Sequence, residues 1–373
     1  MARLFFIVNE DRFFLSHRLP IAISAREMGF EVYIIAKDTG CKDRILENNL
    51  NFINLPINPV GMNLFQELKT FFFIIKLYSN LTPDIVHHVG IKNILWGGLA
   101  AKILKTKGVV NAVSGLGGLF NGGKLSILTK GILKVMKFSN NRPRTAVIFQ
   151  NNDDKKIFID NKVVKGNQIY YIKGSGINLK EYEFSKEKES DKIKIIFTGR
   201  MVKEKGICDL ITAANLLKQD FNEEIQFLLC GRLTPNKSGI TKEYMDKHCD
   251  GSYLCWLGER NDVRQLLEDS HIVAFPSYYR EGVPKSLIEA SAIGRPIITC
   301  DSIGCRDVVE DGINGFLIEP QNPQQLADKL RVLILDRQLR VTMGKNARKK
   351  AESEFSIEKV IDTHLKIYNN LSK

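Results

Sequence analysis

The chain has 373 residues, of which 44% are hydrophobic and 26% are charged, so it is neither disordered nor collagen-like, and its length favours about two domains. A surplus of 54 Lys and Arg over 42 Asp and Glu gives a net charge of +12, which favours an anionic partner such as nucleic acid, an acidic membrane surface or a phosphorylated ligand. Seven cysteines without a CxxC pair indicate neither a disulfide framework nor a zinc module, and we expect a reducing compartment.

The start of the chain predicts a buried strand rather than a targeting segment. The apolar run Leu4–Val8 is followed at once by the polar residues Asn9–Asp11, which makes it too short for the hydrophobic region of a signal peptide. The most apolar later segment, Phe71–Ile75, is interrupted by Lys76 and falls far short of the roughly 20 residues that span a bilayer. We therefore expect a cytoplasmic protein without membrane-spanning segments.

Short β-rich runs alternate with helical patterns along the first half, which is typical of a doubly wound parallel sheet. One helix is predicted at Ser16–Met28, with Ser16 as its cap and Gly29 as its stop signal. The predicted strands are Leu4–Val8, Val32–Ala36, Ile85–His88, Val109–Val113 and Thr145–Phe149.

The second half repeats this organisation after the charge-dense segment Lys180–Asp191, which we interpret as a linker. Its predicted strands are Lys194–Thr198, Ile225–Cys230, Tyr253–Leu257, His271–Phe275 and Ile297–Cys300. The terminal segment Ile357–Leu371 has helical spacing and no strand after it. We expect two α/β domains, residues 1–180 and 191–355, and a terminal helix within 356–373.

The strongest motif is EGVPKSLIE at Glu281–Glu289, which follows the predicted strand His271–Phe275. Pro284 suits the first turn of a helix that Gly294 would end. Ligands of an open parallel sheet bind at such a carboxyl end of a strand. A helix N-terminus there favours an anion, most naturally a phosphate. The backbone amides expected to receive it belong to Val283, Lys285, Ser286 and Leu287.

Glu289 lies four residues after Lys285 and three after Ser286, so it shares their helix face. A carboxylate at that position accepts hydrogen bonds from sugar hydroxyls. A solvated helix with two ordinary glutamates would explain the same spacing.

The second motif is FTGRMVKEKG at Phe197–Gly206. Gly199 allows a turn after the strand, and Arg200 and Lys205 flank a loop that enters a predicted helix. The helix dipole disfavours a cation at Lys205 unless an anion is bound there, whereas an exposed lysine is the plainer interpretation. Both motifs fall at the carboxyl edge of one predicted sheet, which favours a shared phosphate site.

Together these motifs resemble those of family 4 glycosyltransferases, which are retaining enzymes of the GT-B fold. The first half adds three segments that resemble bacterial enzymes of capsular polysaccharide, O-antigen and lipopolysaccharide synthesis: FLSHRLPIA (Phe14–Ala22), PDIVHHVGIKN (Pro83–Asn93) and NAVSGLG (Asn111–Gly117). The resemblance implies two Rossmann-like domains facing a cleft, with the terminal helix crossing back to the first domain.

The resemblance also implies roles for individual residues. Arg200 and Lys205 would clamp the diphosphate of a nucleoside-diphosphate sugar, Glu281 would contact the transferred sugar, and His87 or His88 would line the site from the first domain. Two features depart from many relatives: NEDR (Asn9–Arg12) replaces a glycine-rich loop, and Val89 stands where a histidine is common. The expected donor-binding residues are Gly199, Gly282, Val283, Ser286, Leu287 and Glu289.

The implied reaction moves a hexose or an N-acetylated amino sugar from a UDP-sugar to a polyprenyl-diphosphate-linked glycan. No Asp-x-Asp triplet occurs, so we expect neither a bound metal nor a cofactor, with cations and a helix N-terminus stabilising the departing diphosphate. A soluble acceptor and a non-catalytic nucleotide-sugar-binding protein are the alternatives. Nucleic acid is not expected as a partner, because no RNA-recognition signature or zinc pattern appears.

A basic surface in the first domain indicates where such an enzyme would meet a membrane. No acidic residue occurs between Asp84 and Asp153, and Lys130, Lys134 and Lys137 share one face of a predicted helix. Such a helix can dock on anionic lipid, although a solvated lysine face is the commoner interpretation. We expect a peripheral protein on the inner face of the cell membrane.

Overall fold

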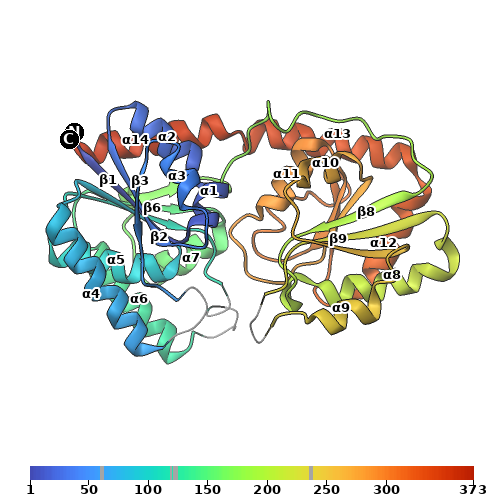
Figure 1. Cartoon of the computed structure of the whole chain (residues 1–373), viewed down its shortest axis with the longest axis horizontal. Helices are drawn as coiled ribbons and strands as arrows, with labels where there is room; N and C mark the ends of the chain where they lie inside the picture. The colour runs from blue at the N-terminus through green and yellow to red at the C-terminus, as the bar shows by residue number, and fades with distance from the viewer. Residues whose placement is uncertain (59–62, 118–119, 121–124, 235–237) are drawn as a thin grey trace. The chain divides into compact units, whose positions relative to one another are not determined.

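The computed structural model describes residues 1–373 except 59–62, 118–119, 121–124 and 235–237. The chain forms two compact units. The first comprises Met1–Gly176 with Ile357–Lys373, and the second comprises Ile177–Ser356. Each unit is built around its own parallel sheet (Figure 1).

The first unit contains a seven-stranded sheet in the order β3-β2-β1-β4-β5-β6-β7, and every neighbouring pair is parallel. Side chains alternate between the two faces of a strand. In β1, Phe6 packs on one face of the sheet and Phe5 on the other. The strands are β1 (Arg3–Glu10), β2 (Glu31–Lys37), β3 (Asn51–Asn54), β4 (Ile85–Val89), β5 (Gly108–Val113), β6 (Thr145–Phe149) and β7 (Ile169–Tyr171).

Helices cover both faces of this sheet. One face packs against α2 and α14, and the other against α4, α5 and α6. The terminal helix therefore completes the core of the first unit, burying residues such as Val360 and Tyr368. The helices are α1 (Asp11–His17), α2 (Leu19–Glu27), α3 (Lys42–Leu46), α4 (Leu64–Leu81), α5 (Ile91–Ile103), α6 (Ile127–Asn140), α7 (Asn152–Asp160), the 3₁₀ turn η2 (Gly166–Gln168) and α14 (Ile357–Ser372).

The second unit contains a six-stranded sheet in the order β10-β9-β8-β11-β12-β13, also parallel throughout. This is the strand order of a Rossmann sheet. The strands are β8 (Ile193–Thr198), β9 (Ile225–Cys230), β10 (Leu254–Gly258), β11 (Ile272–Phe275), β12 (Ile297–Cys300) and β13 (Gly315–Ile318).

Its helices form two groups on opposite faces of the sheet, one containing α10, α11 and α13 and the other α8 and α12 (Figure 1). Their apolar faces and both faces of the sheet share one hydrophobic core. The helices are the 3₁₀ turn η3 (Lys203–Lys205), α8 (Ile207–Phe221), α9 (Lys242–His248), α10 (Val263–Glu268), α11 (Lys285–Ile293), α12 (Pro323–Leu335) and α13 (Arg337–Glu354). Among the described residues, no helix combines the length and the apolar character needed to cross a bilayer.

Two local predictions were wrong. The helix expected from Ser16 is split at Arg18 into α1 and α2, and the Ser16 hydroxyl donates to the Arg12 carbonyl inside α1 instead of capping a helix. The segment 180–191 belongs to the second unit and is tied to it through Glu187, which lies 2.8 Å from the Arg340 guanidinium. The ion pairs of Glu187 and of Lys188 with Asp269 hold this segment against the folded body of the second unit, so it is not a free linker.

Candidate functional site

The site is positioned by the point at which the strand order of the second sheet reverses. Strands β8 and β11 are parallel neighbours there, and their following connections run to opposite sides. Ligands of open α/β sheets bind outside the carboxyl ends of the strands at such a switch point. The motif FTGRMVKEKG leaves β8 and EGVPKSLIE follows β11, so the fold brings the two predicted motifs together.

Backbone hydrogen bonds join the two loops directly. The amides of Tyr278 and Tyr279 donate to the Glu204 carbonyl at 3.0 and 3.1 Å. Gly206 sits in the left-handed region with φ +77°, and a Cβ there would overlap the carbonyl oxygen of Pro276. Only glycine satisfies both conditions, which fixes the loop that carries Lys205.

Lys205 forms an ion pair with Glu281 across the two loops. Both side chains are largely buried, with 10% of Lys205 and 17% of Glu281 exposed. The Lys205 ammonium also lies 4.7 Å from the centre of the Phe275 ring, a cation–π distance. Sequence reasoning paired these two charged residues in one site but missed Phe275, whose only signal was its place as the last residue of the strand.

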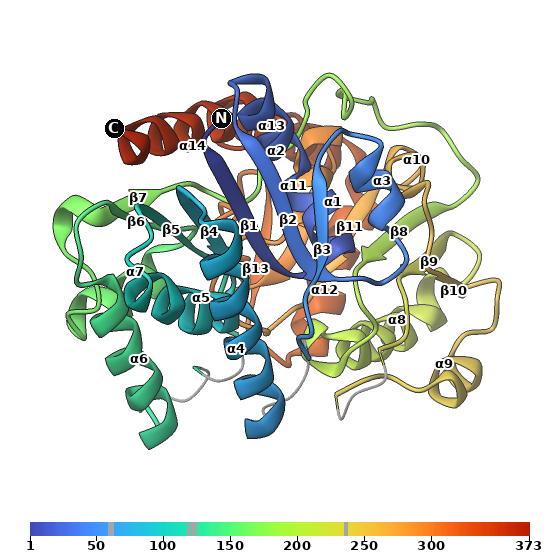
Figure 2. The ribbon, with the colours of Figure 1, turned by 60° about the vertical axis from the view of Figure 1, so that its left-hand side comes forward.

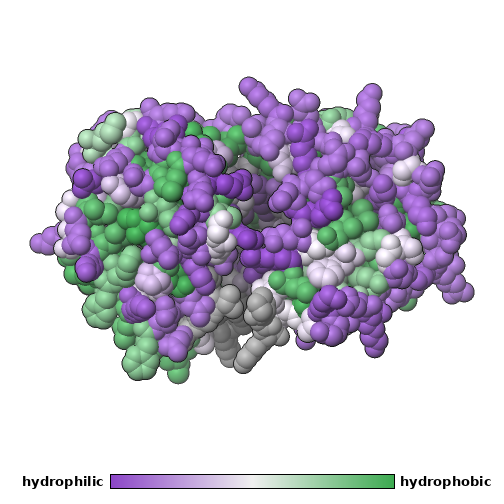
Figure 3. All heavy atoms as spheres, in the orientation of Figure 1, coloured by the Kyte–Doolittle hydropathy of each residue, from purple (hydrophilic) through white to green (hydrophobic). Residues whose placement is uncertain are grey.

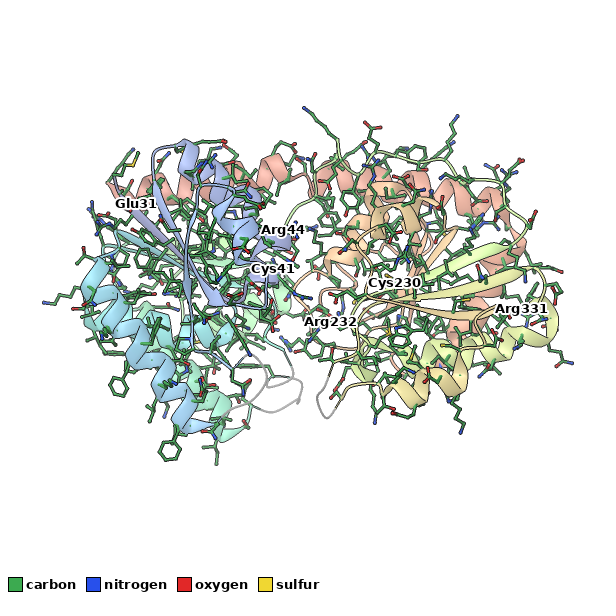
Figure 4. All side chains as sticks on the ribbon, in the orientation of Figure 1. Glu31, Cys41, Arg44, Cys230, Arg232 and Arg331 are labelled. Carbon is green, nitrogen blue, oxygen red and sulfur yellow. The ribbon has the colours of Figure 1, made fainter. Side chains whose placement is uncertain are left out.

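Arg200 is exposed immediately after Gly199, at the carboxyl end of β8. The Gly199 amide donates to the Cys230 carbonyl at 2.9 Å, and a Cβ on Gly231 would overlap the Gly199 carbonyl oxygen. The loop after β9 therefore abuts the Arg200 loop. Arg232, labelled with Cys230 in Figure 4, is a further basic residue at this edge. The sequence analysis missed it, although Gly231, which follows the predicted strand directly, marked the turn that carries it.

Helix α11 begins and ends where its sequence signals place it. Pro284 is the residue before its first turn, and Gly294 closes it with φ +86°. Ser286 is half-buried on the first turn, whereas Gly282 and Val283 are buried. The expected contribution of the Leu287 amide needs correction, because this N–H donates to the Pro284 carbonyl at 3.1 Å.

Glu289 lies one turn into α11 with 14% of its side chain exposed. Its Oε1 is 3.8 Å from the Lys285 ammonium, which confirms the predicted shared face. The Tyr182 hydroxyl donates to the same oxygen at 3.3 Å. Burial raises the pKa of Glu289 above its ordinary value, and Lys285 and Tyr182 only partly oppose that effect. Tyr182 was missed because it lies 107 residues away in the sequence.

The loop after β12 is a third part of the site that sequence reasoning missed. The Ser302 hydroxyl donates to the Ser277 carbonyl at 2.7 Å. Gly304 has φ +86°, and a Cβ there would overlap the Gly282 carbonyl oxygen. This loop supports the backbone beside Glu281, and again a glycine shortly after a strand was the available signal.

The site role expected for His87 or His88 does not fit their surroundings, because both side chains are fully buried in the first unit. His87 Nδ1 lies 2.7 Å from the Tyr368 hydroxyl of α14. His88 points to the opposite face, where Nε2 lies 2.8 Å from the Tyr78 hydroxyl. Alternation along β4 places both under helices, so they pack in the core rather than line a binding surface.

Within the described residues, no group of three or more His, Cys, Asp and Glu side chains is arranged to hold a metal ion. The charged groups gathered at the switch point are instead Arg200, Lys205, Glu281, Lys285 and Glu289. Two loop cations and a helix N-terminus suit a diphosphate, while carboxylates suit sugar hydroxyls.

Both halves of the chain match known families. Residues 3–151 match the family described as Glycosyl transferase 4-like, and residues 179–350 match Glycosyl transferases group 1. The chain belongs to these glycosyltransferases. The family resemblance inferred from the motifs is thereby confirmed, and the matched ranges correspond to the two units of the fold.

Relatives of this glycosyltransferase extend over nearly the whole chain. It is 28% identical to N,N'-diacetylbacillosaminyl-diphospho-undecaprenol alpha-1,3-N-acetylgalactosaminyltransferase of Campylobacter jejuni, covering 96% of this chain and 98% of the relative. It is 26% identical to UDP-Gal:alpha-D-GlcNAc-diphosphoundecaprenol alpha-1,3-galactosyltransferase of Escherichia coli, covering 91% and 89%.

The fold is shared with solved glycosyltransferase structures. Anabaena Alr3699/HepE, solved in complex with UDP-glucose, superposes with a TM-score of 0.78 at 20% identity, and the match covers 100% of both chains. At that identity the likeness concerns the fold alone. The glycosyltransferase therefore has the expected GT-B architecture of two Rossmann-like domains.

Proposed function

We propose that this glycosyltransferase moves a hexose or an N-acetylated amino sugar from a UDP-sugar to a polyprenyl-diphosphate-linked glycan during capsule or O-antigen synthesis. The observation that carries the proposal is the meeting of Arg200, Lys205, Glu281 and the first turn of α11 at the switch point of the second sheet. Two named relatives support the acceptor class, since both act on undecaprenyl-diphosphate-linked sugars.

The donor would be held by the second unit. Arg200 and Lys205 would neutralise the diphosphate, and the N-terminal turn of α11 with Ser286 would receive a phosphate oxygen. Glu289 would accept hydrogen bonds from the ribose hydroxyls. Glu281, together with the backbone of Gly282 and Val283, would contact the transferred sugar.

The proposed reaction retains the anomeric configuration. The acceptor hydroxyl oxygen attacks the anomeric carbon on the face from which UDP departs, and the bond from that carbon to the β-phosphate oxygen breaks with its electron pair. The departing phosphate takes the hydroxyl proton, so that the products are UDP and the glycoside. Arg200 and Lys205 stabilise the negative charge that develops on the diphosphate, so the step as proposed uses no metal ion or cofactor.

The acceptor class implies where the enzyme works. A polyprenyl carrier stays in the bilayer, so the enzyme would act as a peripheral protein on the inner face of the cell membrane, where nucleotide sugars are available. The net charge of +12 favours binding to anionic lipid surfaces.

A donor and acceptor screen tests this function. The protein is incubated with a panel of UDP-sugars and with lipid extracts containing diphosphate-linked glycans, and products are identified by mass spectrometry. We expect one glycolipid whose mass increases by a single hexose or N-acetylhexosamine, with an α linkage by NMR from an α-linked donor. Transfer to a soluble glycan but to no lipid-linked one would reject the proposed acceptor, and binding of donor without transfer or hydrolysis would reject the enzyme.

A further inference from the structure

Helix α4 presents apolar side chains to solvent along one face. Its inner face packs into the core through Thr70, Ile74 and Tyr78. Opposite, the exposed fractions are 67% for Leu64, 84% for Phe65, 37% for Leu68 and 63% for Phe72. Large exposed side chains scattered singly are ordinary, whereas a contiguous apolar stripe on one helix marks an interaction surface.

Helix α6 adds exposed apolar residues at its own beginning. Ile127 is 92% exposed and Leu128 is 51% exposed. The two helices flank α5, and their N-terminal ends project from the same side of the first unit, at the carboxyl edge of its sheet (Figure 2). Apolar surface also covers the part of this unit in which α4 and α6 lie (Figure 3).

Lysines surround this apolar surface. Lys69 and Lys76 of α4 and Lys130, Lys134 and Lys137 of α6 are all exposed. The only acidic residue of α4, Glu67, is buried and lies 2.6 Å from the Lys92 ammonium, while α6 contains no acidic residue.

A hollow beside α6 continues the positive surface. It has a volume of about 520 Å³, and its lining contains four lysines and no acidic residue. Lys134 and Lys137 contribute from α6, and Lys162 and Lys165 from the segment after α7. The charge around the apolar residues is thus of a single sign, which complements the phosphates of anionic lipid headgroups.

We propose that the α4–α6 surface, defined by Leu64, Phe65, Leu68, Phe72, Ile127 and Leu128 with the lysines around them, docks on an anionic bilayer. The apolar side chains enter the boundary between headgroups and acyl chains, and the lysines bind the phosphates. This refines the sequence prediction, which placed docking on the lysines of α6 alone. The reason for docking, a carrier-bound acceptor, rests on the proposed function.

The same observations disfavour a second copy of the chain as the occupant. A symmetric dimer would bring this surface onto itself, so the lysines of α4 and α6 would face one another without acidic partners. A bilayer instead supplies both an apolar phase and negative charge. Docking through α4 and α6 would also bring the carboxyl edge of the first sheet, where an open α/β unit binds its ligand, to the membrane surface.

Vesicle flotation tests the apolar part of the surface. The full-length protein is mixed with phosphatidylglycerol-containing vesicles, and the Phe65→Ser/Phe72→Ser variant is compared with wild type. We expect wild type to float and to stay partly bound in high salt, because salt screens charges but not inserted apolar groups. The variant lacks two of those apolar groups and should lose binding at least about tenfold. Ile313→Ser/Leu335→Ser is the matched control, since those exposed residues lie on the second unit, and it should float like wild type.

Charge reversal tests the lysines. Lys130→Glu/Lys134→Glu/Lys137→Glu should abolish flotation at low salt, and Lys247→Glu/Lys345→Glu/Lys349→Glu, which changes the charge equally on exposed positions of the second unit, should reduce it far less. If the two triple variants lose vesicle binding equally, the loss follows from the change in net charge alone, and the assignment of this surface is overturned.

Two further outcomes would overturn the proposal. One is flotation of the Phe65→Ser/Phe72→Ser variant equal to wild type. The other is that wild type does not float and instead forms a dimer, detected by light scattering, which the Phe65→Ser/Phe72→Ser substitutions dissociate.

A transfer assay in detergent tests the proposed enzyme function independently of membrane docking. In detergent with a solubilised acceptor, the Phe65→Ser/Phe72→Ser variant should transfer sugar like wild type, and it should lose transfer only to acceptor embedded in vesicles. Absence of transfer by wild type in detergent would reject the proposed function while leaving the flotation result intact.

Discussion

At the scale of single residues, the site depends on how Lys205 is held. Its ammonium pairs with Glu281 and lies over the Phe275 ring, in surroundings with little solvent. Arg200, by contrast, is exposed at the end of β8. Removing one partner of a largely buried ion pair leaves the other uncompensated, so changes at Lys205 affect both stability and catalysis, whereas changes at Arg200 report on ligand binding more directly.

Replacing Arg200 or Lys205 with alanine should slow sugar transfer. Each cation is proposed to stabilise the departing diphosphate, which carries more charge in the transition state than in the bound donor. We expect a loss of roughly 2–4 kcal/mol of transition-state stabilisation, or about two to three orders of magnitude in kcat/KM. Lys203→Ala serves as the control, because Lys203 is exposed in the same 3₁₀ turn. Normal turnover by a folded Arg200→Ala/Lys205→Ala variant would reject both roles.

Substitution of Glu281 and of Glu289 should have different effects in a calorimetric titration with UDP. Glu289→Gln should weaken UDP binding if the carboxylate holds the ribose, whereas Glu281→Gln should leave UDP affinity nearly intact and slow transfer. Because burial raises the pKa of Glu289 above its ordinary 4.5, affinity should begin to fall at a higher pH on acidification than for an exposed glutamate, and Glu289→Gln should remove that dependence. Glu223→Gln, at an 84% exposed side chain, is the control. If both glutamine variants bind UDP and transfer sugar normally, neither carboxylate has the role proposed for it.

At the scale of elements, the sequence predicted every interior strand but only one of the four edge strands, β10. The strands β3, β7 and β13 were not predicted, and each lies at the edge of its sheet. They contain four, three and four residues, most of them exposed or only half-buried. The interior strands β11 and β12 are equally short, but every residue in them is buried, which produces the hydrophobic run that marks a doubly covered strand. Edge strands are defined mainly by the neighbour with which they pair, and that neighbour is distant in sequence.

The loop between β8 and α8 offers a matched pair of glycine substitutions. Gly206 and Gly312 have φ values of +77° and +76°, but only at Gly206 would a Cβ overlap neighbouring backbone. Both alanine variants should lose roughly 1–2 kcal/mol of unfolding free energy from the left-handed conformation. Gly206→Ala should lose about 1–3 kcal/mol more from the steric overlap, and its UDP affinity should fall because the loop that carries Lys205 must move. Urea unfolding and UDP titration measure both effects, and equal results for the two variants would show that the overlap is relieved without cost.

At the scale of the whole molecule, the first unit buries three histidines, whereas the second buries one, His271. The first unit buries His87, His88 and His364 between its sheet and the covering helices. Burial lowers the pKa of His88 to about 4 and that of His364 to about 3, and that of His87 falls well below its usual range. All three are therefore neutral in the folded protein.

The first unit should consequently lose stability in mild acid. A histidine whose pKa is lowered by folding contributes stability above its ordinary value of 6.5, and this stability is lost as the pH falls from there toward the folded-state values. Below pH 6 each such histidine should reduce the unfolding free energy by about 1.4 kcal/mol per pH unit. Urea unfolding followed through Trp96 in a Trp256→Phe background reports on the first unit alone.

His364→Gln gives the matched comparison for this pH dependence. Removing one of the three histidines should reduce the slope between pH 6 and pH 4.5 by about a third, even if the variant is less stable throughout. An unchanged slope would show that the buried histidines do not govern acid unfolding.

The sequence by itself determined the two α/β units, the interior strands and the two motifs of the second unit. These depend on local patterns: hydrophobic runs for buried strands, and glycine and proline at the ends of helices. The pattern also predicted that FTGRMVKEKG and EGVPKSLIE would meet, because parallel strands bring their carboxyl ends to the same edge of a sheet.

Only the tertiary structure decided which residues work with those motifs and which lie elsewhere. Tyr182 reaches Glu289 from 107 residues away, and α14 crosses into the first unit to cover His87. Neither contact leaves a local pattern, because it depends on how distant segments pack. The exposure of Phe65 and Phe72 could not be predicted from the sequence either. Phenylalanine usually lies in the core, and only the fold shows which face of α4 is left exposed to solvent.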